Sequence, residues 1–302
     1  MAPRNPPGIV TVGLGKRYKS SWALQDCSVS VPRGRITALI GANGAGKTTF
    51  LKILAGLSAP TEGTVEVLGR PPGQEQEFLD SVGYLAQDVP LYRRLSAADH
   101  LALCARMNRH WDSGEARERL ARLGILDHRP VSALSGGQRA QLGLSLVLAK
   151  HPRLLLLDEP VAALDPLARH DFLTSLVQAA AARELSVIMS SHLLHDLEQV
   201  CDHVILLTGS RVSLHGDIGD VLNGHRVLVS KERQLTDAWP GLTVINSAWI
   251  ASRTRALARV AGQVPGPIAE VTAPTLEDIV LAYMRRDRAL AAGQQARNRQ
   301  GS

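Results

Sequence analysis

Cysteine is scarce in this sequence, with only three among 302 residues, far apart at positions 27, 104 and 201. They stand among apolar or mixed residues, and no Cys or His partners lie at the short spacing that a metal site needs. We therefore interpret them as buried, reduced thiols. This suits a protein of the cytoplasm.

Long apolar runs are also absent. The longest, such as 154–157 and 204–207, fall far short of the roughly 18 residues that would cross a bilayer. The first eight residues contain no apolar core, so no export signal is expected. A hydrophobic content of 45% with 21% charged residues is that of an ordinary globular protein. The length allows one domain of ordinary size plus a small extra module.

Aromatic residues make up only 4% of the chain and do not alternate with basic residues, as a base-stacking surface would require. The net charge is nevertheless +6 and the sequence pI is about 9.5. Part of this excess lies in the run 285–288 and in the tail beyond it. We therefore expect a solvated basic tail, close to an anionic membrane surface if it has a partner, and no nucleic-acid partner.

Residues 41–48 form a complete phosphate-binding loop between a predicted strand and a predicted helix. The run 35–40 is short, β-branched and mostly apolar, whereas 49–55 is an apolar helix that Gly56 would end. A strand, a glycine loop and a helix are the context that turns this pattern into a nucleotide site. The residues expected to bind the nucleotide here are Gly41, Ala42, Asn43, Gly44, Ala45, Gly46, Lys47, Thr48 and Thr49.

Each part of this loop has a physical task. Glycines let backbone N–H groups converge on phosphate oxygens, and the N-terminus of the following helix adds positive potential. Lys47 can reach the outer phosphates, and the hydroxyl of Thr48 can ligate Mg²⁺. The sequence therefore predicts binding of a nucleoside triphosphate.

Four polar residues follow four predicted strands. Lys47 follows the strand 35–40, and Gln87 follows 82–86. Asp158 follows 154–157, and His192 follows 185–189. Ligands of an open parallel sheet bind beyond the carboxyl ends of its strands. We therefore expect the four to converge on one crevice, although singly a Gln there is usually a solvated loop residue and a lone His is usually structural.

Asp158 and Glu159 come directly after a buried apolar strand, where an unpaired carboxylate would be costly. A Mg²⁺ ion bridged through water would justify Asp158. The alternative is an acidic strand end that caps the loop before Pro160. The phosphate loop upstream makes that alternative the weaker one.

A further motif, Leu-Ser-Gly-Gly-Gln at 134–138, precedes a predicted helix at 139–149. Ser135 and Gln138 by themselves would form a capping box for that helix. A serine followed by two glycines, here Gly136 and Gly137, is also a good anion site at a helix N-terminus. Both interpretations can hold at once.

The order of these motifs resembles the ATP-binding cassette (ABC) family of ATPases, over about residues 9–215. The resemblance implies ATP and Mg²⁺ as cofactors. It assigns catalysis to Glu159, Gln87 and His192, and metal binding to Thr48, Gln87 and Asp158. It assigns stacking on adenine to Tyr18 and organisation of the dimer interface to Asp165. It also implies that ATP held by another subunit is contacted by Ser135, Gly136, Gly137 and Gln138. Tyr18 has an alternative as an aromatic packed on a sheet. Ala162 and Ala163 depart from the Ser-Gly more often seen before this aspartate, which puts the geometry around Asp165 in doubt.

The expected fold class is α/β, with a phosphate-loop ATPase sheet core, an antiparallel β subdomain, an all-helical insertion and a small C-terminal α/β module. The expected divisions are a disordered N-terminus 1–8, an ATP-binding domain 9–220 with antiparallel strands in 9–32 and the helical insertion at about 89–149, an accessory module 221–286 and a disordered basic tail 287–302. Within the module, we expect strands at 225–229 and 242–246, a helix at 253–260 and a capped helix at 275–284.

The resemblance implies the ATP-hydrolysing subunit of an ABC transporter. With no membrane span in the sequence, the permease would be a separate polypeptide, and this chain would be cytoplasmic and peripheral, on the inner face of the membrane. One phosphate loop and one Leu-Ser-Gly-Gly-Gln motif per chain imply a homodimer or pairing with a second ABC cassette. Residues 276–280 look like those of bacterial subunits paired with exporters, which favours export.

Two other functions are open from the sequence. A non-transport ABC ATPase that acts on ribosomes or DNA would usually carry two fused cassettes, zinc-binding cysteines or long coiled-coil arms, and none is visible. A transcription-regulating ATPase would need 221–286 to bind DNA, but this segment has no convincing helix-turn-helix. We expect 221–286 to be regulatory or dimer-stabilising, so that a chain truncated near Gly219 still binds ATP. The alternative is a module that depends on burial against the cassette.

Overall fold

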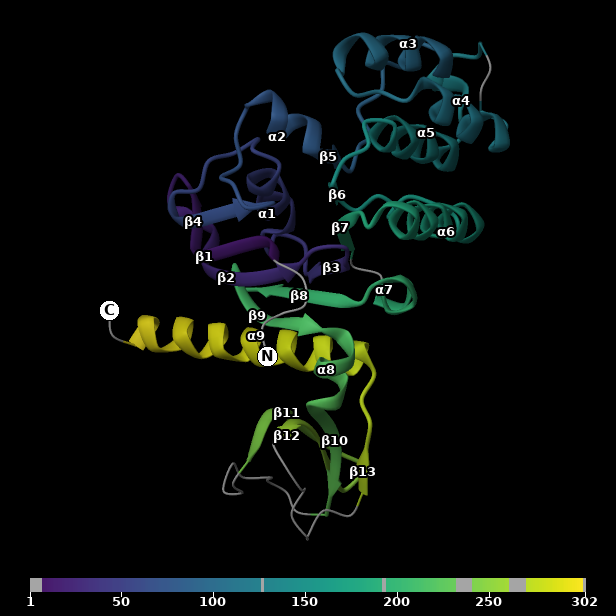
Figure 1. The fold of residues 1–302 in the computed structure, drawn as a ribbon. Coiled ribbons are helices and arrows are strands. Elements are labelled where there is room, and N and C mark those ends of the chain that lie inside the picture. The colour runs from purple at the N-terminus through teal and green to yellow at the C-terminus, as the bar shows by residue number, and fades with distance from the viewer. Residues whose placement is uncertain (1–6, 126–127, 192–193, 232–240, 261–269, 301–302) are drawn as a thin grey trace.

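The computed structural model describes residues 7–125, 128–191, 194–231, 241–260 and 270–300, which form three sheets and their surrounding helices (Figure 1). The central sheet has six strands in the order β5-β6-β7-β3-β8-β9. These strands are β3 (Ile36–Gly41), β5 (Val82–Leu85), β6 (Leu154–Leu157), β7 (Ser186–Ser191), β8 (His203–Thr208) and β9 (Arg211–Asp217). Five of them run parallel, and β9 returns antiparallel to β8.

The central strands are apolar almost without interruption because both faces of this sheet are covered, as parallel sheets require. Side chains alternate between two cores along each strand: Ala38 and Ile40 of β3 belong to one core, and Leu39 belongs to the other. The core that contains Leu39 includes helix α1 (Lys47–Leu54). The opposite core includes α5 (Gly136–Leu148) and α6 (Pro166–Arg183).

A three-stranded antiparallel sheet packs against the α1 face, in the order β2-β1-β4. Its strands are β1 (Pro7–Tyr18), β2 (Ser21–Pro32) and β4 (Glu62–Val67). The prediction of antiparallel strands in 9–32 is therefore confirmed, although β1 begins at Pro7, inside the segment expected to be disordered. Residues 1–6 lie outside the described residues. The short helix α2 (Gln76–Ser81) then leads into β5.

The predicted helical insertion is also present. It contains α3 (Ala97–Met107), α4 (Ser113–Arg122), a 3₁₀ turn at Val131–Ala133 and α5. These elements share a core of their own, in which Leu101, Leu120 and Leu142 are at most 3% exposed. The remaining face of α5 joins the main core, so the insertion forms a lobe attached to the sheet through one helix (Figure 1).

The C-terminal module is a four-stranded antiparallel sheet in the order β11-β12-β10-β13. Its strands are β10 (His225–Ser230), β11 (Leu242–Ile250), β12 (Arg253–Val260) and β13 (Glu270–Thr272). The predicted strands at 225–229 and 242–246 are confirmed, but the helix predicted at 253–260 is wrong, because this segment is β12. Its alanines favour a helix locally, yet Ala256 and Ala258 are at most 1% exposed between β10 and β11, so strand pairing overrides propensity.

Two helices connect this module to the rest of the molecule. α8 (Ile218–Asn223) spans the predicted boundary at residue 220, and α9 (Leu276–Gln300) crosses under β8 and β9 (Figure 1). Thr275 caps α9: the Asp278 N–H donates to its hydroxyl, and the Asp278 carboxylate accepts from the Thr275 N–H. The capped helix is therefore confirmed, but the tail predicted to be disordered from 287 is helical as far as Gln300. Another short helix, α7 (Leu194–Val200), follows β7. None of the helices in the described ranges has the length and apolar character of a membrane span.

Candidate functional site

The phosphate loop lies between β3 and α1, as the sequence predicts. Gly44 and Gly46 have φ values of +81° and +105°, in the left-handed region that glycine tolerates. At Gly46 a Cβ would also lie 2.3 Å from the backbone oxygen of Ala23 in β2. The loop therefore needs glycine at this position both for its backbone conformation and for its contact with the antiparallel sheet.

Lys47, the first residue of α1, is folded back into the loop. Its side chain is only 6% exposed, and its Nζ donates to the backbone oxygen of Gly41 at 2.8 Å. The same Nζ lies 3.1 Å from Oε1 of Glu159. The cation that is predicted to bind the outer phosphates thus pairs with the carboxylate to which the family resemblance assigns catalysis.

Asp158 and Glu159 directly follow β6. Asp158 is 2% exposed, and its backbone N–H donates to the oxygen of Leu85 in the neighbouring strand at 2.9 Å. Burial, followed by the charge of Asp158, raises the pKa of Tyr84 to about 12, so this phenol stays protonated at neutral pH. Because β5 and β6 are paired, the backbone hydrogen bond from Asp158 to Leu85 holds Asp158 in a fixed place at the sheet edge.

Ser190 is a residue of this site that the sequence did not reveal. It is fully buried in β7, and its hydroxyl donates to Oδ1 of Asp158 at 2.9 Å. It also accepts the backbone N–H of Glu159 at 2.8 Å. The only available signal was its place two residues before His192, at the end of a predicted strand.

Three of the four predicted residues follow strand ends at one common edge of the sheet, whereas their convergence on one crevice stays a prediction. β5, β6, β7 and β3 are consecutive neighbours in the sheet, so the segments that carry Gln87, Asp158 and Lys47 leave the same edge. Gln87 and Glu159 line one cavity of about 410 Å³ together with Gly136. His192 lies outside the described residues, although β7 ends directly before it.

The residues predicted to hold Mg²⁺ have suitable chemistry. Thr48 exposes its side chain in the first turn of α1, and Asp158 places a buried carboxylate at the end of β6. Hydroxyl and carboxylate oxygens are the hard donors that Mg²⁺ prefers. When bound, the ion would neutralise charge on the phosphates of the nucleotide.

The Leu-Ser-Gly-Gly-Gln motif begins α5, where the predicted capping box is confirmed. The hydroxyl of Ser135 accepts the Gln138 N–H at 3.2 Å, and the Gln138 side chain accepts the Ser135 N–H at 3.0 Å. A Cβ at Gly137 would lie 2.7 Å from the Cβ of Ala168 in α6, so this glycine permits close packing of the two helices. Ser135 and Gly136 remain exposed, at the surface of the helical lobe.

The positions of Asp165 and Tyr18 are compatible with their predicted roles at the dimer interface and on adenine, and both roles stay predictions. Asp165 caps α6 by accepting the backbone N–H of Ala168 at 2.9 Å. Tyr18 is the last residue of β1 and is 48% exposed. The Nζ of Lys16 lies 5.3 Å from the centre of its ring. The stacking of Tyr18 on adenine therefore stays a prediction.

Comparison with known proteins agrees with this geometry. The family model described as ABC transporter matches residues 24–162. The chain is 37% identical to a nickel import ATP-binding protein of Rhodobacter capsulatus, over 72% of this chain and 91% of that protein. It is 30% identical to a lantibiotic transport ATP-binding protein of Streptococcus pyogenes, over 73% of this chain and 97% of the relative.

The fold is also similar to that of solved ABC cassettes. A dimeric bacterial ABC transporter cassette superposes with a TM-score of 0.62, over 69% of this chain and 98% of that one, at 23% identity. The glycine loop at 41–48 and the Leu-Ser-Gly-Gly-Gln helix lie within the segment 24–162 that the family model matches. The two relatives are each at least 30% identical and are almost fully covered. The chain therefore belongs to the ABC transporter family of ATP-binding proteins and is an ATPase.

Proposed function

We propose that this ATPase powers transport through a separate membrane permease and works as a head-to-tail pair of cassettes. The observation that carries the pairing is that one chain has one phosphate loop and one Leu-Ser-Gly-Gly-Gln motif, on different lobes (Figure 1). The exposed Ser135 and Gly136 are available to a second chain, as an anion site at a helix N-terminus. That one solved cassette of this fold is dimeric supports the arrangement.

In the proposed reaction, the backbone amides of the loop and Lys47 hold the phosphates of ATP. Lys47 exchanges its contact with Glu159 for the phosphate oxygens, which releases the carboxylate. Glu159 then orients the attacking water and accepts its proton. Gln87 and His192 contact the water and the γ-phosphate, and Thr48, Gln87 and Asp158 would hold Mg²⁺. As the water oxygen bonds to the γ-phosphorus, the bond to the β–γ bridging oxygen breaks and ADP leaves.

The Glu159→Gln variant tests this scheme. The amide keeps hydrogen bonding but takes no proton, so turnover should fall by about a hundredfold or more while ATP still binds. Because hydrolysis is what reopens the pair, the variant should accumulate as a dimer in Mg-ATP. Size-exclusion chromatography with light scattering checks this outcome. A variant that stays monomeric in Mg-ATP would contradict the closed-dimer mechanism.

The membrane permease is proposed as the partner because the relatives are ATP-binding proteins of nickel import and lantibiotic transport.

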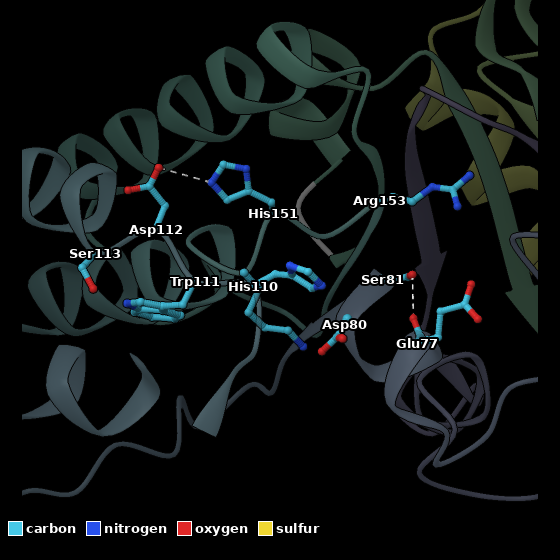
Figure 2. Close-up of a pocket in the computed structure, with 10 residues that line it drawn as sticks. Glu77, Asp80, Ser81, His110, Trp111, Asp112, Ser113, His151 and Arg153 are labelled. Atoms are coloured by element: carbon cyan, nitrogen blue, oxygen red, sulfur yellow. Dashed lines mark hydrogen bonds and ion pairs between the residues drawn. The ribbon is translucent and has the colours of Figure 1, made fainter. Parts of the chain in front are cut away.

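An open groove of about 660 Å³ lies between the sheet core and the helical lobe (Figure 2). Trp111 and His110 of the helical lobe stand on one side of it, and Asp80 of α2 stands on the other. Lys150 joins the two sides, since its Nζ donates to the backbone oxygens of Leu79 and Val82 at 2.7 and 3.1 Å.

The groove occupies the right place to transmit motion. α2 and Arg153 immediately precede β5 and β6, so they lie at the opposite ends of the two strands that lead to Gln87 and Asp158. A permease segment in this groove would touch both lobes at once. We propose that the permease docks there and thereby places the ATPase at the cytoplasmic face of the membrane. Residues 276–280 favour export as the direction.

Cross-linking in membranes tests the docking site. Cysteine introduced at His110 should cross-link to a co-purifying multi-span protein through a short thiol-reactive linker. The control is His128→Cys, which is also exposed in the same lobe but lies outside the groove. Equal cross-linking from both positions would exclude the groove. Co-purification of ribosomes or DNA in place of a membrane protein would favour the alternative of a non-transport ATPase.

A further inference from the structure

The hydroxyl of Ser190 joins the two acidic residues of the site into one hydrogen-bonded unit. It accepts the N–H of Glu159 at 2.8 Å, and its single proton goes to Oδ1 of Asp158 at 2.9 Å. Ser190 is fully buried and Asp158 is 2% exposed, so water does not compete strongly for these bonds. Hydrogen bonds in such a chain polarise and strengthen one another.

Glu159 needs this support because its backbone conformation is unfavourable. Its φ is +46°, in the left-handed region. This conformation has a free-energy cost for any residue other than glycine. It also precedes Pro160, and a residue before proline prefers an extended backbone. Its N–H bond to Ser190 is one constraint that holds Glu159 away from that preference.

This conformation determines where the catalytic carboxylate points. With φ at +46°, Oε1 of Glu159 reaches 3.1 Å from Nζ of Lys47, at the phosphate loop. Relaxation of residue 159 to an extended backbone would turn its Cβ, and the carboxylate with it, away from the loop. A misplacement of about 1 Å is enough to cost a reaction a factor of about a hundred.

We propose that Ser190 is a positioning residue for ATP hydrolysis, which fixes the direction of the Glu159 carboxylate and the orientation of the Asp158 carboxylate. The inference rests on the proposed role of Glu159 as the base. Ser190 itself contacts neither ATP nor water in this scheme. Its effect is therefore expected on the rate of the chemical step and on the Mg²⁺ requirement, more than on the affinity for ATP.

The Ser190→Ala variant should lower kcat by roughly ten- to a hundredfold, raise the Mg²⁺ concentration needed for half-maximal turnover, and leave the KM for ATP within about twofold. Hydrogen exchange of the Glu159 amide, measured without nucleotide, should become faster. Ser190→Thr keeps the hydroxyl and should restore slow exchange and most of the turnover. If Ser190→Ala does not fold, kcat and exchange of the Glu159 amide are measured in Ser190→Cys. The cysteine side chain is nearly the size of serine, but its thiol is a weak hydrogen-bond donor.

The matched control is Thr37→Val. Thr37 is also fully buried, in the same sheet, and its hydroxyl makes no hydrogen bond within the described part of the chain. This control should change neither amide exchange at Glu159 nor kcat. Wild-type exchange and kcat in Ser190→Ala, or equal losses in Thr37→Val, would overturn the inference. If Glu159→Gln instead retains full turnover, the assignment of the base is what fails.

Discussion

Replacing Lys47 with alanine is expected to lower ATP turnover by about a thousandfold or more. Lys47 is buried at the phosphate loop, and its Nζ lies 3.1 Å from Oε1 of Glu159. Its removal takes away the charge that stabilises the outer phosphates as the bond to the γ-phosphate breaks. Phosphate release by the purified variant in Mg-ATP, with and without its permease, measures the loss.

A control on the same helix separates this effect from damage to the fold. Lys52 is exposed on α1, and it lies outside the loop. Lys52→Ala should keep wild-type turnover, and both variants should give unchanged circular dichroism. The Glu159 side chain is only 12% exposed, so Lys47→Ala also leaves a partly buried carboxylate without this ion pair and should lower the melting temperature slightly. Undiminished turnover in Lys47→Ala would rule out this site.

Truncation after Gly219 is expected to abolish the folded state, contrary to the expectation from sequence that the shortened chain still binds ATP. Residues of α9 belong to the same core as the central sheet and α6: Leu276, Ile279, Val280, Ala282 and Tyr283 are at most 6% exposed there. Burial of a large apolar side chain contributes about 1.5–3 kcal/mol, while a whole domain is stable by only about 5–15 kcal/mol. The truncated protein should therefore aggregate, measured as the soluble fraction after expression.

Polar contacts anchor α9 to the same surface. Leu276 donates its N–H to Glu198 of α7 at 2.7 Å, and the Asp287 carboxylate accepts from Thr208 and Ser213. A chain that ends at Ala289 keeps these contacts and removes the end of α9 that starts at Leu290, which is 59% exposed. This control should be soluble and should bind ATP as the full chain does. A soluble Gly219 truncation that binds ATP would show that the module is accessory after all.

The sequence alone determined the elements whose chemistry is local. The glycines at 44 and 46 require a left-handed loop between an apolar strand and a helix, and the spacing of Ser135 and Gln138 produces a capping box. Parallel β-strands follow from apolar runs with polar residues at their ends, so the common edge that carries Lys47, Gln87 and Asp158 could be predicted. These features depend on residues close together in the chain, where spacing fixes geometry.

The tertiary structure alone decided what depends on distant neighbours. The segment 253–260 has a helix-favouring composition, but pairing with β10 and β11 makes it a strand. α9 reads as part of a separate module, yet its apolar face completes the core of the ATPase domain. Ser190 stands in an ordinary apolar strand, and only the folding of β7 beside β6 brings its hydroxyl to Asp158 and Glu159, 32 and 31 residues earlier in the chain. A sequence pattern records which side chains are present, whereas strand pairing and burial decide which of them meet.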